Sequence, residues 1–268
     1  MNERFGFIGC GNMGSALASA VVEAVGGANV ALSGRTAEKV QRCAKALGAS
    51  ASSNEAIAQS ATFIFLGVKP QMMAGLLSDI APILQSRTDR FVLVSMAAGL
   101  TMERICEMAG GAYPVIRIMP NTAVSVGEGI VLYTANDLVT EGEAAEAVDA
   151  MHCCGLLDPI SESQMDAGSA LAGCGGAFCD LFMEALADGA VAAGLPRAKA
   201  QQYAAQVLCG AGKLLSSSGK HPGLLKDEVC SPGGSTIQGV RALERGGFRA
   251  AAMEAVIAAC EKNKELGK

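Results

Sequence analysis

The sequence predicts two domains, an α/β domain built on a mostly parallel sheet and, after it, an all-helical domain. Three observations predict this. A strand, a glycine turn and a helix open the chain; short apolar runs alternate with helical patterns as far as about residue 160; and from Gln164 onward the spacing is helical only. We therefore place the boundary so that residues 1–160 form the first domain and residues 161–268 the second.

The chain opens on a short apolar strand, Arg4-Phe-Gly-Phe-Ile-Gly9, which leads into Gly9-Cys-Gly-Asn-Met-Gly14 and then a helix. A G-x-G-x-x-G between a strand and a helix is a dinucleotide-binding signature. Gly9 allows the tight turn, Gly11 lets a pyrophosphate reach the backbone, and Gly14 lets the helix pack closely on the strand. The first domain is therefore expected to be a Rossmann-type dinucleotide-binding domain.

The end of the second strand indicates which dinucleotide is bound. NAD-binding proteins usually have Asp or Glu there, which holds the ribose 2′-hydroxyl. This strand, Asn29-Val-Ala-Leu-Ser33, ends instead in Ser33-Gly-Arg35. Because a guanidinium offers paired donors that match phosphate oxygens, we expect NADPH as the cofactor, with NADH possible.

The α/β alternation continues along the first domain. Its further expected strands are 62–67, 91–95, 115–118, 124–126, 130–133 and 156–160, and its further expected helices are 37–47, a short one after 54, one that ends at 83, and 141–151. Three of these strands end in small or polar residues, where open α/β sheets bind ligands.

A second glycine turn lies in the helical domain, in Asp227-Glu-Val-Cys-Ser-Pro-Gly-Gly-Ser-Thr236. Gly233 and Gly234 expose bare backbone, and the apolar spacing of Ile237, Val240 and Leu243 predicts a helix directly after them. The first amides of a helix lack internal partners and favour an anion. Two glycine turns would thus serve two anions, a cofactor pyrophosphate and a substrate carboxylate.

Composition excludes several classes of function. The net charge is −5, and no cluster of Lys and Arg is long enough to track a nucleic-acid backbone. The ten cysteines are scattered without a Cys-x-x-Cys pair, and with only two histidines this argues against a metal site and against a disulfide framework. His152 and His221 are expected to be structural, and Asp227 and Glu228 to be helix-flanking charges.

The first helix of the second domain is expected over 165–194, followed by helices 196–217 and 236–266, the last broken at Gly246-Gly247, with a short turn at 224–226 between them. Charged residues at helical spacing (Asp180, Glu184, Asp188) favour a soluble helix over a membrane span. The chain starts without a signal peptide, so we expect a cytoplasmic protein. The long helix is rich in small residues, and a face around Ala170, Gly173 and Ala177 is expected to pack against a second subunit.

At several of these motifs the sequence resembles pyrroline-5-carboxylate reductase, over almost its full length and in the same order. The motifs are Gly6-Phe-Ile-Gly-Cys-Gly-Asn-Met-Gly14, Val68-Lys-Pro-Gln71, Met119-Pro-Asn-Thr122 and above all Asp227 to Phe248. The resemblance implies hydride transfer from NAD(P)H to the C=N carbon of 1-pyrroline-5-carboxylate, the last step of proline biosynthesis. It also implies a homodimer formed by the helical domains, which is often assembled further into a ring of dimers.

The resemblance also assigns site residues. For the substrate carboxylate it implies Ser231, Gly233, Gly234 and Ser235, and for the ring nitrogen Thr236, the single candidate catalytic residue. For the cofactor it implies three groups of residues. Those at the pyrophosphate are Ile8, Gly9, Gly11, Asn12, Met13 and Gly14, and those at the adenosine end are Ser33, Arg35 and Asn54. Those at the ribose and nicotinamide are Val68, Lys69, Pro70, Ala97, Ala98, Gly99 and Asn121.

The sequence departs from the family pattern in the segment Ala172-Gly-Cys-Gly-Gly-Ala-Phe178, which lacks three hydroxyls and a proline usual there. We assign this segment no catalytic role. Two other readings remain: a related imine reductase or β-hydroxyacid-type dehydrogenase, which would carry its own Lys or Asp motif in the helical domain, and a non-catalytic NADP-sensing module, which would have no need of a second glycine turn.

Overall fold

The computed structural model describes residues 4–266 and divides the chain into two compact units. The first unit runs as far as Cys174 and takes in the chain from Ala259 onward, and the second is Gly175–Ala258. The first unit contains all the strands and the second is helical. An α/β part followed by a helical part was the fold that the sequence predicted, and that prediction is confirmed.

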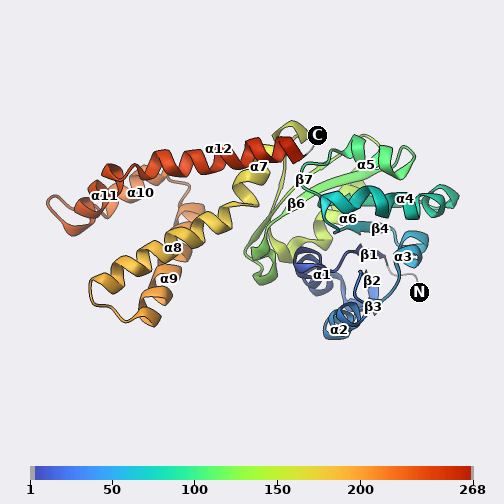
Figure 1. Cartoon of the computed structure of the whole chain (residues 1–268), viewed down its shortest axis with the longest axis horizontal. Helices are drawn as coiled ribbons and strands as arrows, with labels where there is room; N and C mark the ends of the chain where they lie inside the picture. Colours follow the sequence, from blue (N-terminus) through green and yellow to red (C-terminus); the bar gives the residue numbers. More distant parts are fainter. Residues whose placement is uncertain (1–3, 267–268) are drawn as a thin grey trace. The chain divides into compact units, whose positions relative to one another are not determined.

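The first unit is built on one eight-stranded sheet with the order β3-β2-β1-β4-β5-β6-β7-β8 (Figure 1). The strands pair in parallel except for β6 and β7, which are antiparallel. Strand bounds are β1 Phe5–Ile8, β2 Val30–Ser33, β3 Ser50–Ala51, β4 Phe63–Leu66, β5 Val92–Ser95, β6 Val115–Pro120, β7 Gly129–Ala135 and β8 Gly155–Pro159.

Helices cover both faces of this sheet. The central strands β1, β2, β4, β5 and β6 are therefore buried along their whole length. One face packs on α1, α2 and α6, and the other on α3, α4 and α5, with α7 over β6 and β7. The helices are α1 Asn12–Val25, α2 Ala37–Leu47, α3 Asn54–Ser60, α4 Pro70–Ser86, α5 Met102–Ala109, α6 Glu141–Ala150 and α7 Met165–Ala172, and four short 3₁₀ turns are η1 Gly27–Asn29, η2 Thr122–Val126, η3 His152–Cys154 and η4 Glu162–Gln164.

Three elements of this unit differ from the prediction. The expected strand at 124–126 is instead η2, a 3₁₀ turn that ends at Gly127 with φ +70° and buries Val124 in the core. Helix α5 was not predicted, although the hydroxyl of Thr101 accepts from the amide of Arg104 at its start and Gly110 ends it with φ +73°. The two-residue strand β3 was too short to show a pattern.

The second unit contains α8 Gly175–Ala192, α9 Arg197–Ser218, α10 Pro222–Glu228, α11 Ser235–Arg245 and the first half of α12 Phe248–Leu266. The prediction of one unbroken helix over 165–194 is wrong, because a turn at Gly173 and Cys174 separates α7 from α8. The expected turn at 224–226 is part of the short helix α10. The break at Gly246-Gly247 is confirmed, and Gly247 has φ +74°.

The run Glu162–Ala192 is long and apolar enough, by length and composition alone, to cross a membrane. In the single chain, 17% of its most apolar stretch is buried. Its first part, α7, packs on β6 and β7 in the first unit. The charged residues of α8 lie in the other part: Asp188 pairs with Arg197 on α9.

Candidate functional site

The first glycine turn lies where the strand order of the sheet reverses. From β1 the chain continues to β2 and β3 on one side and returns to β4 on the other. The loops after β1 and β4 therefore diverge and leave an opening at the carboxyl edge of the sheet, which is where open α/β sheets bind ligands.

Backbone contacts hold this turn in a shape that suits glycine. Gly9 has φ +111°, and a Cβ there would lie 2.7 Å from the carbonyl carbon of Gly67 in the loop after β4. The amides of Gly9 and Cys10 both donate to the carbonyl of Ser33, at 3.0 Å, and Gly67 donates to the carbonyl of Ile8, at 2.8 Å. The turn is thus fastened to the loops on both sides.

The same turn starts α1 with its first amides open to a ligand. Gly11, the N-cap residue, has no side chain to cap the helix, and the first turn carries no acidic residue. No atom lies within 4 Å of the place where a Gly11 Cβ would be. Free amides and the positive end of the helix dipole then face open space, which fits the pyrophosphate of a dinucleotide.

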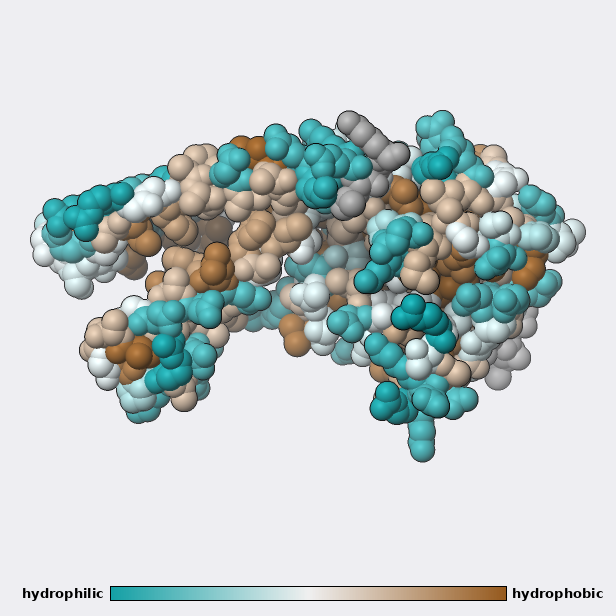
Figure 2. All heavy atoms as spheres, in the orientation of Figure 1, coloured by the Kyte–Doolittle hydropathy of each residue, from teal (hydrophilic) through white to brown (hydrophobic). Residues whose placement is uncertain are grey.

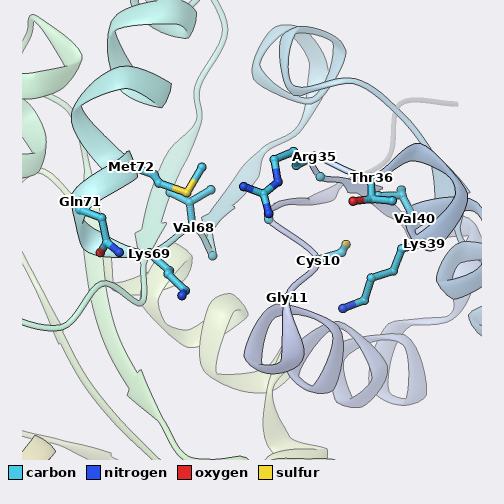
Figure 3. Close-up of a pocket in the computed structure, with 13 residues that line it drawn as sticks. Cys10, Gly11, Arg35, Thr36, Lys39, Val40, Val68, Lys69, Gln71 and Met72 are labelled. Carbon is cyan, nitrogen blue, oxygen red and sulfur yellow. The ribbon is translucent and has the colours of Figure 1, made fainter.

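A cleft of about 420 Å³ opens at this point and is lined by the first glycine turn, the loop after β2 and the loop after β4. Figure 3 shows Arg35 and Lys39 extending from the segment after β2 toward Cys10 and Gly11, with Lys69, Gln71 and Met72 across the opening. A second cleft shares Gly9, Arg35 and Val68 with it and continues to Asn54. Of the residues assigned to the cofactor, these clefts bring together Gly9, Gly11, Arg35, Asn54, Val68 and Lys69.

Several residues that the sequence analysis did not assign also line the first cleft, among them Thr36 and Lys39. Lys39 lies in the first turn of α2, four residues after Arg35, and both side chains are exposed. Helical spacing could have identified Lys39, because a residue in the first turn of the helix after β2 lies close to the carboxyl end of that strand. The clefts thus hold two cations near the adenosine end and no acid at the end of β2.

Ser33 does not line either cleft, because its side chain is only 1% exposed. Its hydroxyl lies 2.8 Å from Oδ1 of Asn54 and 3.3 Å from the carbonyl oxygen of Phe7. Ser33 therefore positions Asn54, which lines the second cleft, and its hydroxyl is already engaged inside the protein.

The residues assigned to the nicotinamide follow β5 and β6. Ala97 and Gly99 are buried in the turn after β5, where Gly99 has φ +77° and the hydroxyl of Ser95 accepts from the amide of Ala97 at 3.4 Å. Asn121 follows β6; it donates to the carbonyl of Ala172 and accepts from the amide of Ile130, both at 3.2 Å. The side chain of Asn121 is therefore occupied in holding α7 and β7 to the end of β6.

The second glycine turn, in the other unit, has the form expected of an anion site. Gly233 has φ +71°, Gly234 is the N-cap of α11 and donates to the carbonyl of Ser231 at 3.0 Å, and the helix start has no side-chain cap and no acid in its first turn. Ser231, Gly233, Ser235 and Thr236 are exposed in the single chain. The start of α11 thus presents open amides and hydroxyls together.

The charged groups beside this turn are paired with each other. Asp227 forms an ion pair with Lys226, and Glu228 with Lys220. His221 caps α10, since its Nδ1 accepts from the amide of Gly223 at 3.0 Å. The structure agrees with the structural role expected for His221 and with the helix-flanking role expected for Asp227 and Glu228. The hydroxyls of Ser231, Ser235 and Thr236 remain exposed in this turn.

Comparison with known proteins gives one family. Residues 162–266 match the model described as pyrroline-5-carboxylate reductase dimerisation, and residues 4–99 match the model described as NADP oxidoreductase coenzyme F420-dependent. The chain is 38% identical to pyrroline-5-carboxylate reductase of Escherichia coli K12, over 100% of both chains. It is 42% identical to pyrroline-5-carboxylate reductase 3 of Danio rerio, over 98% of this chain and 91% of that protein. The chain belongs to the pyrroline-5-carboxylate reductase family.

The fold agrees with that membership along the whole chain. The crystal structure of Plasmodium falciparum pyrroline carboxylate reductase with NADP bound superposes with a TM-score of 0.89 at 34% identity, covering 100% of this chain and 99% of the other. These comparisons confirm the predicted family, enzyme class and NADP cofactor. The residue assignments of the site stay predictions.

Family membership also bears on the apolar surface of the second unit. Figure 2 shows apolar residues gathered over the helices there. A groove of about 420 Å³ lies between α8 and the start of α12, lined by Phe178, Leu181, Phe182, Phe248 and small residues, and the Leu181 side chain is 68% exposed. A surface of this kind in a domain that matches a dimerisation family is suited to a subunit contact. The prediction that Ala170 contacts a second subunit is wrong, because Ala170 is 0% exposed within its own unit.

Proposed function

We propose that this protein reduces 1-pyrroline-5-carboxylate to L-proline with NADPH, and that residues 1–160 bind the cofactor while residues 161–268 bind the substrate and form the dimer. The observation that carries the proposal is the second glycine turn: an uncapped, acid-free start of α11 in a chain related to these reductases along its full length. A cofactor-sensing protein would have no use for it.

The residues of the first unit fit the cofactor. Gly11 leaves room for the pyrophosphate at the start of α1, and a side chain at Gly9 would collide with the backbone of the neighbouring loop. Arg35 and Lys39 are the cations placed to read a 2′-phosphate, with Asn54 on the ribose beside them and Val68, Lys69, Pro70, Ala97, Ala98, Gly99 and Asn121 toward the nicotinamide. Bound NADPH would supply the hydride for the C=N bond.

The residues of the second unit are assigned to the substrate. The amide of Ser235 and the hydroxyl of Ser231 would bind its carboxylate beside the bare backbone of Gly233 and Gly234, since the start of a helix favours an anion. The hydroxyl of Thr236, in the first turn of α11, would bind the ring nitrogen. An anion held at one point and a nitrogen held at another fix the ring in one orientation, which is a large part of what an enzyme contributes to a reaction between two bound molecules.

The proton on the imine nitrogen is proposed to come from solvent. A cyclic imine accepts hydride far better when protonated, and the acids nearest Thr236 along the chain are paired with cations: Asp227 and Glu228 with lysines, and Glu244 with Arg249. The substrate would therefore bind largely as its iminium, and Thr236 would orient the N–H rather than supply the proton.

We further propose that the protein is a homodimer through the helices of the second unit, assembled into a ring of dimers, and that it works in the cytoplasm. The exposed apolar groove of α8 and α12 supports the first part. The dimerisation domain that the chain matches supports it too.

The proposal is tested by measuring NADPH oxidation by the purified protein with pyrroline-5-carboxylate and identifying the product by chromatography. We expect oxidation that depends on this substrate and forms proline in equal amount. An acyclic 2- or 3-hydroxyacid with NADP⁺ is the control for a β-hydroxyacid-type dehydrogenase. Cofactor binding without turnover of any of these compounds would contradict the proposal and favour a sensing role.

A further inference from the structure

Arg117, in the middle of β6, is a cation buried in the first unit, with a side chain that is 3% exposed. Its Nη1 lies 3.4 Å from Oε1 of Glu162 in η4, and its Nη2 lies 3.7 Å from Oδ1 of Asp166 in α7. Among the described residues, its Nε and Nη2 have no hydrogen-bond partner, and neither has Oγ of Ser169, one turn beyond Asp166. A buried charge that is paired so loosely costs stability, so stabilisation alone does not account for it.

The place of Arg117 in the sheet links it to the turn after β5. Arg117 pairs with Ser95 on β5 and with Thr134 on β7, and residues in register on neighbouring strands point to the same face. The hydroxyl of Ser95 accepts from the amide of Ala97, the first residue of that turn assigned to the nicotinamide. A row of polar residues therefore crosses the three neighbouring strands β5, β6 and β7 on one face of the sheet.

Glu162 secures the other end of the same turn. The oxygen that faces Arg117, Oε1, also accepts from the amide of Met102, the first residue of α5, at 2.8 Å. The first amides of a helix need partners from outside the helix, and here a carboxylate sixty residues along the chain supplies one. The turn from Ala97 to Thr101 is thus held by Ser95 at its start and by Glu162 at its end.

The ion cluster and Asn121 fasten the two ends of one helical segment. Glu162 and Asp166 lie at the start of the η4–α7 segment, and Asn121 donates to the carbonyl of Ala172 at its end. Two of the segments that we assign to the ribose and nicotinamide, the turn after β5 and Asn121 after β6, are therefore fixed against η4–α7 by polar contacts.

We propose that Arg117 and Glu162 are positioning residues for hydride transfer. Arg117 holds the Glu162 carboxylate in place, the carboxylate fixes the start of α5, and this sets where the Ala97–Thr101 turn lies beside the nicotinamide. Neither side chain is assigned a contact with the cofactor or the substrate. This inference rests on the proposed function, because the turn matters only if a nicotinamide lies beside it.

The test compares two double variants that both remove the charges of Arg117 and Glu162. In Arg117→Met/Glu162→Gln the amide oxygen can still accept from Met102, and in Arg117→Met/Glu162→Ala no acceptor is left. Because the two differ mainly in that one hydrogen bond, we expect kcat to be about tenfold lower in the alanine double variant. The dissociation constant of NADPH and the Tm should agree between the two. The isotope effect with C4-deuterated NADPH should be larger in the alanine double variant, since the hydride step then limits turnover more.

Glu107→Gln is the matched control, because Glu107 lies on the same helix α5 and forms only an exposed pair with Arg104; its kcat should equal that of the wild type. Equal kcat in the two double variants, or a loss of kcat that follows a loss of NADPH binding or of Tm, would overturn the inference. The wild type separates this from a failure of the proposed function: if it does not reduce pyrroline-5-carboxylate, the function is wrong, whereas an active wild type with equal double variants rejects only the positioning role.

Discussion

A Cβ on Gly14 would lie 2.2 Å from the carbonyl oxygen of Gly9, the residue that begins the same glycine turn. Helix α1 and the turn after β1 are therefore in direct backbone contact, and nothing larger than glycine fits. Gly11, between them in the sequence, differs: a Cβ there would meet no atom within 4 Å. The motif thus contains two glycines required by the fold, Gly9 and Gly14, and one required by the ligand, Gly11.

The two alanine variants should separate these roles. Gly14→Ala should lower the free energy of unfolding by about 3 kcal/mol or more, since the methyl group collides with backbone that cannot rotate away. Gly11→Ala should fold with a Tm near that of the wild type and lose NADPH affinity, because its methyl group enters the space of the pyrophosphate. Urea denaturation and fluorescence titration with NADPH measure the two quantities; a strongly destabilised Gly11→Ala would contradict this division.

Cofactor preference is expected to depend on Arg35 and Lys39. Arg35→Ala should cost about 1.5–3 kcal/mol of NADPH affinity, the range for a hydrogen bond to a charged group, with little effect on NADH. Lys39→Ala should weaken NADPH in the same direction but less, because an ammonium group is a point charge without the paired donors of a guanidinium. Calorimetric titration with each cofactor measures both. Equal losses for NADPH and NADH would show that neither residue reads the 2′-phosphate.

Much of this arrangement could be predicted from the sequence because it depends on local patterns. The strand, glycine turn and helix at residues 4–14 are contiguous, and so are the start of α11 and the break before α12. Lys39 was missed because only the geometry of the helix brings it to the cleft. Ala170 was misassigned because a small residue is compatible both with a contact to a neighbouring subunit and with packing on its own sheet.

The ion cluster could not be predicted at all. Arg117, Glu162 and the amide of Met102 come from three elements far apart in the chain, and no spacing rule brings them together. Helix α5, by contrast, carries its own signals, a Thr101 cap, apolar residues at helical spacing and a glycine at its end, and was missed because it is only eight residues long.

One surface pair should give a pH-dependent part of the stability. Hydrogen bonding to Arg90 lowers the pKa of Glu143 from 4.5 to about 2, helped by the amide and hydroxyl of Thr140. A carboxylate with a depressed pKa stabilises the folded state above its unfolded pKa, and that contribution is lost as the pH falls from 4.5 toward 2.

Glu143→Gln keeps the acceptor of the capping box with Thr140 and removes the charge. It should lower the free energy of unfolding by about 0.5–1 kcal/mol near neutral pH, the range for an exposed pair. This difference from the wild type in free energy of unfolding should disappear as the pH falls from 4.5 toward 2. Denaturant unfolding across pH measures it. Arg90→Met should show at least that difference, because it also removes the hydrogen bond from Nη2 of Arg90 to the carbonyl of Leu138. Adding Glu143→Gln to it should cause no further loss, and a difference between Glu143→Gln and wild type that does not change with pH would exclude the ion pair as its cause.

Assembly is expected to depend on the groove between α8 and α12. Leu181→Asp puts a charge on an exposed apolar side chain of that groove and should shift the protein from dimer to monomer. Leu138→Asp, a substitution of the same kind at an exposed leucine before α6, should leave the dimer intact. Sedimentation velocity at micromolar concentration distinguishes the two. A folded wild-type monomer under those conditions would contradict the prediction.

The chemistry is expected to depend on the hydroxyl of Thr236. Thr236→Val keeps the branched shape in the first turn of α11 and removes only the group that orients the ring nitrogen. Because the carboxylate would still be held by the start of the helix, the loss should fall mainly on the transition state. We expect kcat/KM to fall by roughly 10- to 1,000-fold, about 1.5–4 kcal/mol, which spans a lost hydrogen bond and a lost transition-state donor.

The residues assigned to the cofactor lie in the other unit, so NADPH affinity and Tm should not change in Thr236→Val. Thr236→Ser, which restores the hydroxyl, should recover most of the activity and is the matched control. Steady-state kinetics with pyrroline-5-carboxylate and NADPH titrations on the three proteins decide the matter. If Thr236→Val turns over at the wild-type rate, the hydroxyl has no part in the reaction, and the ring must be oriented by its carboxylate and by contacts with the cofactor alone.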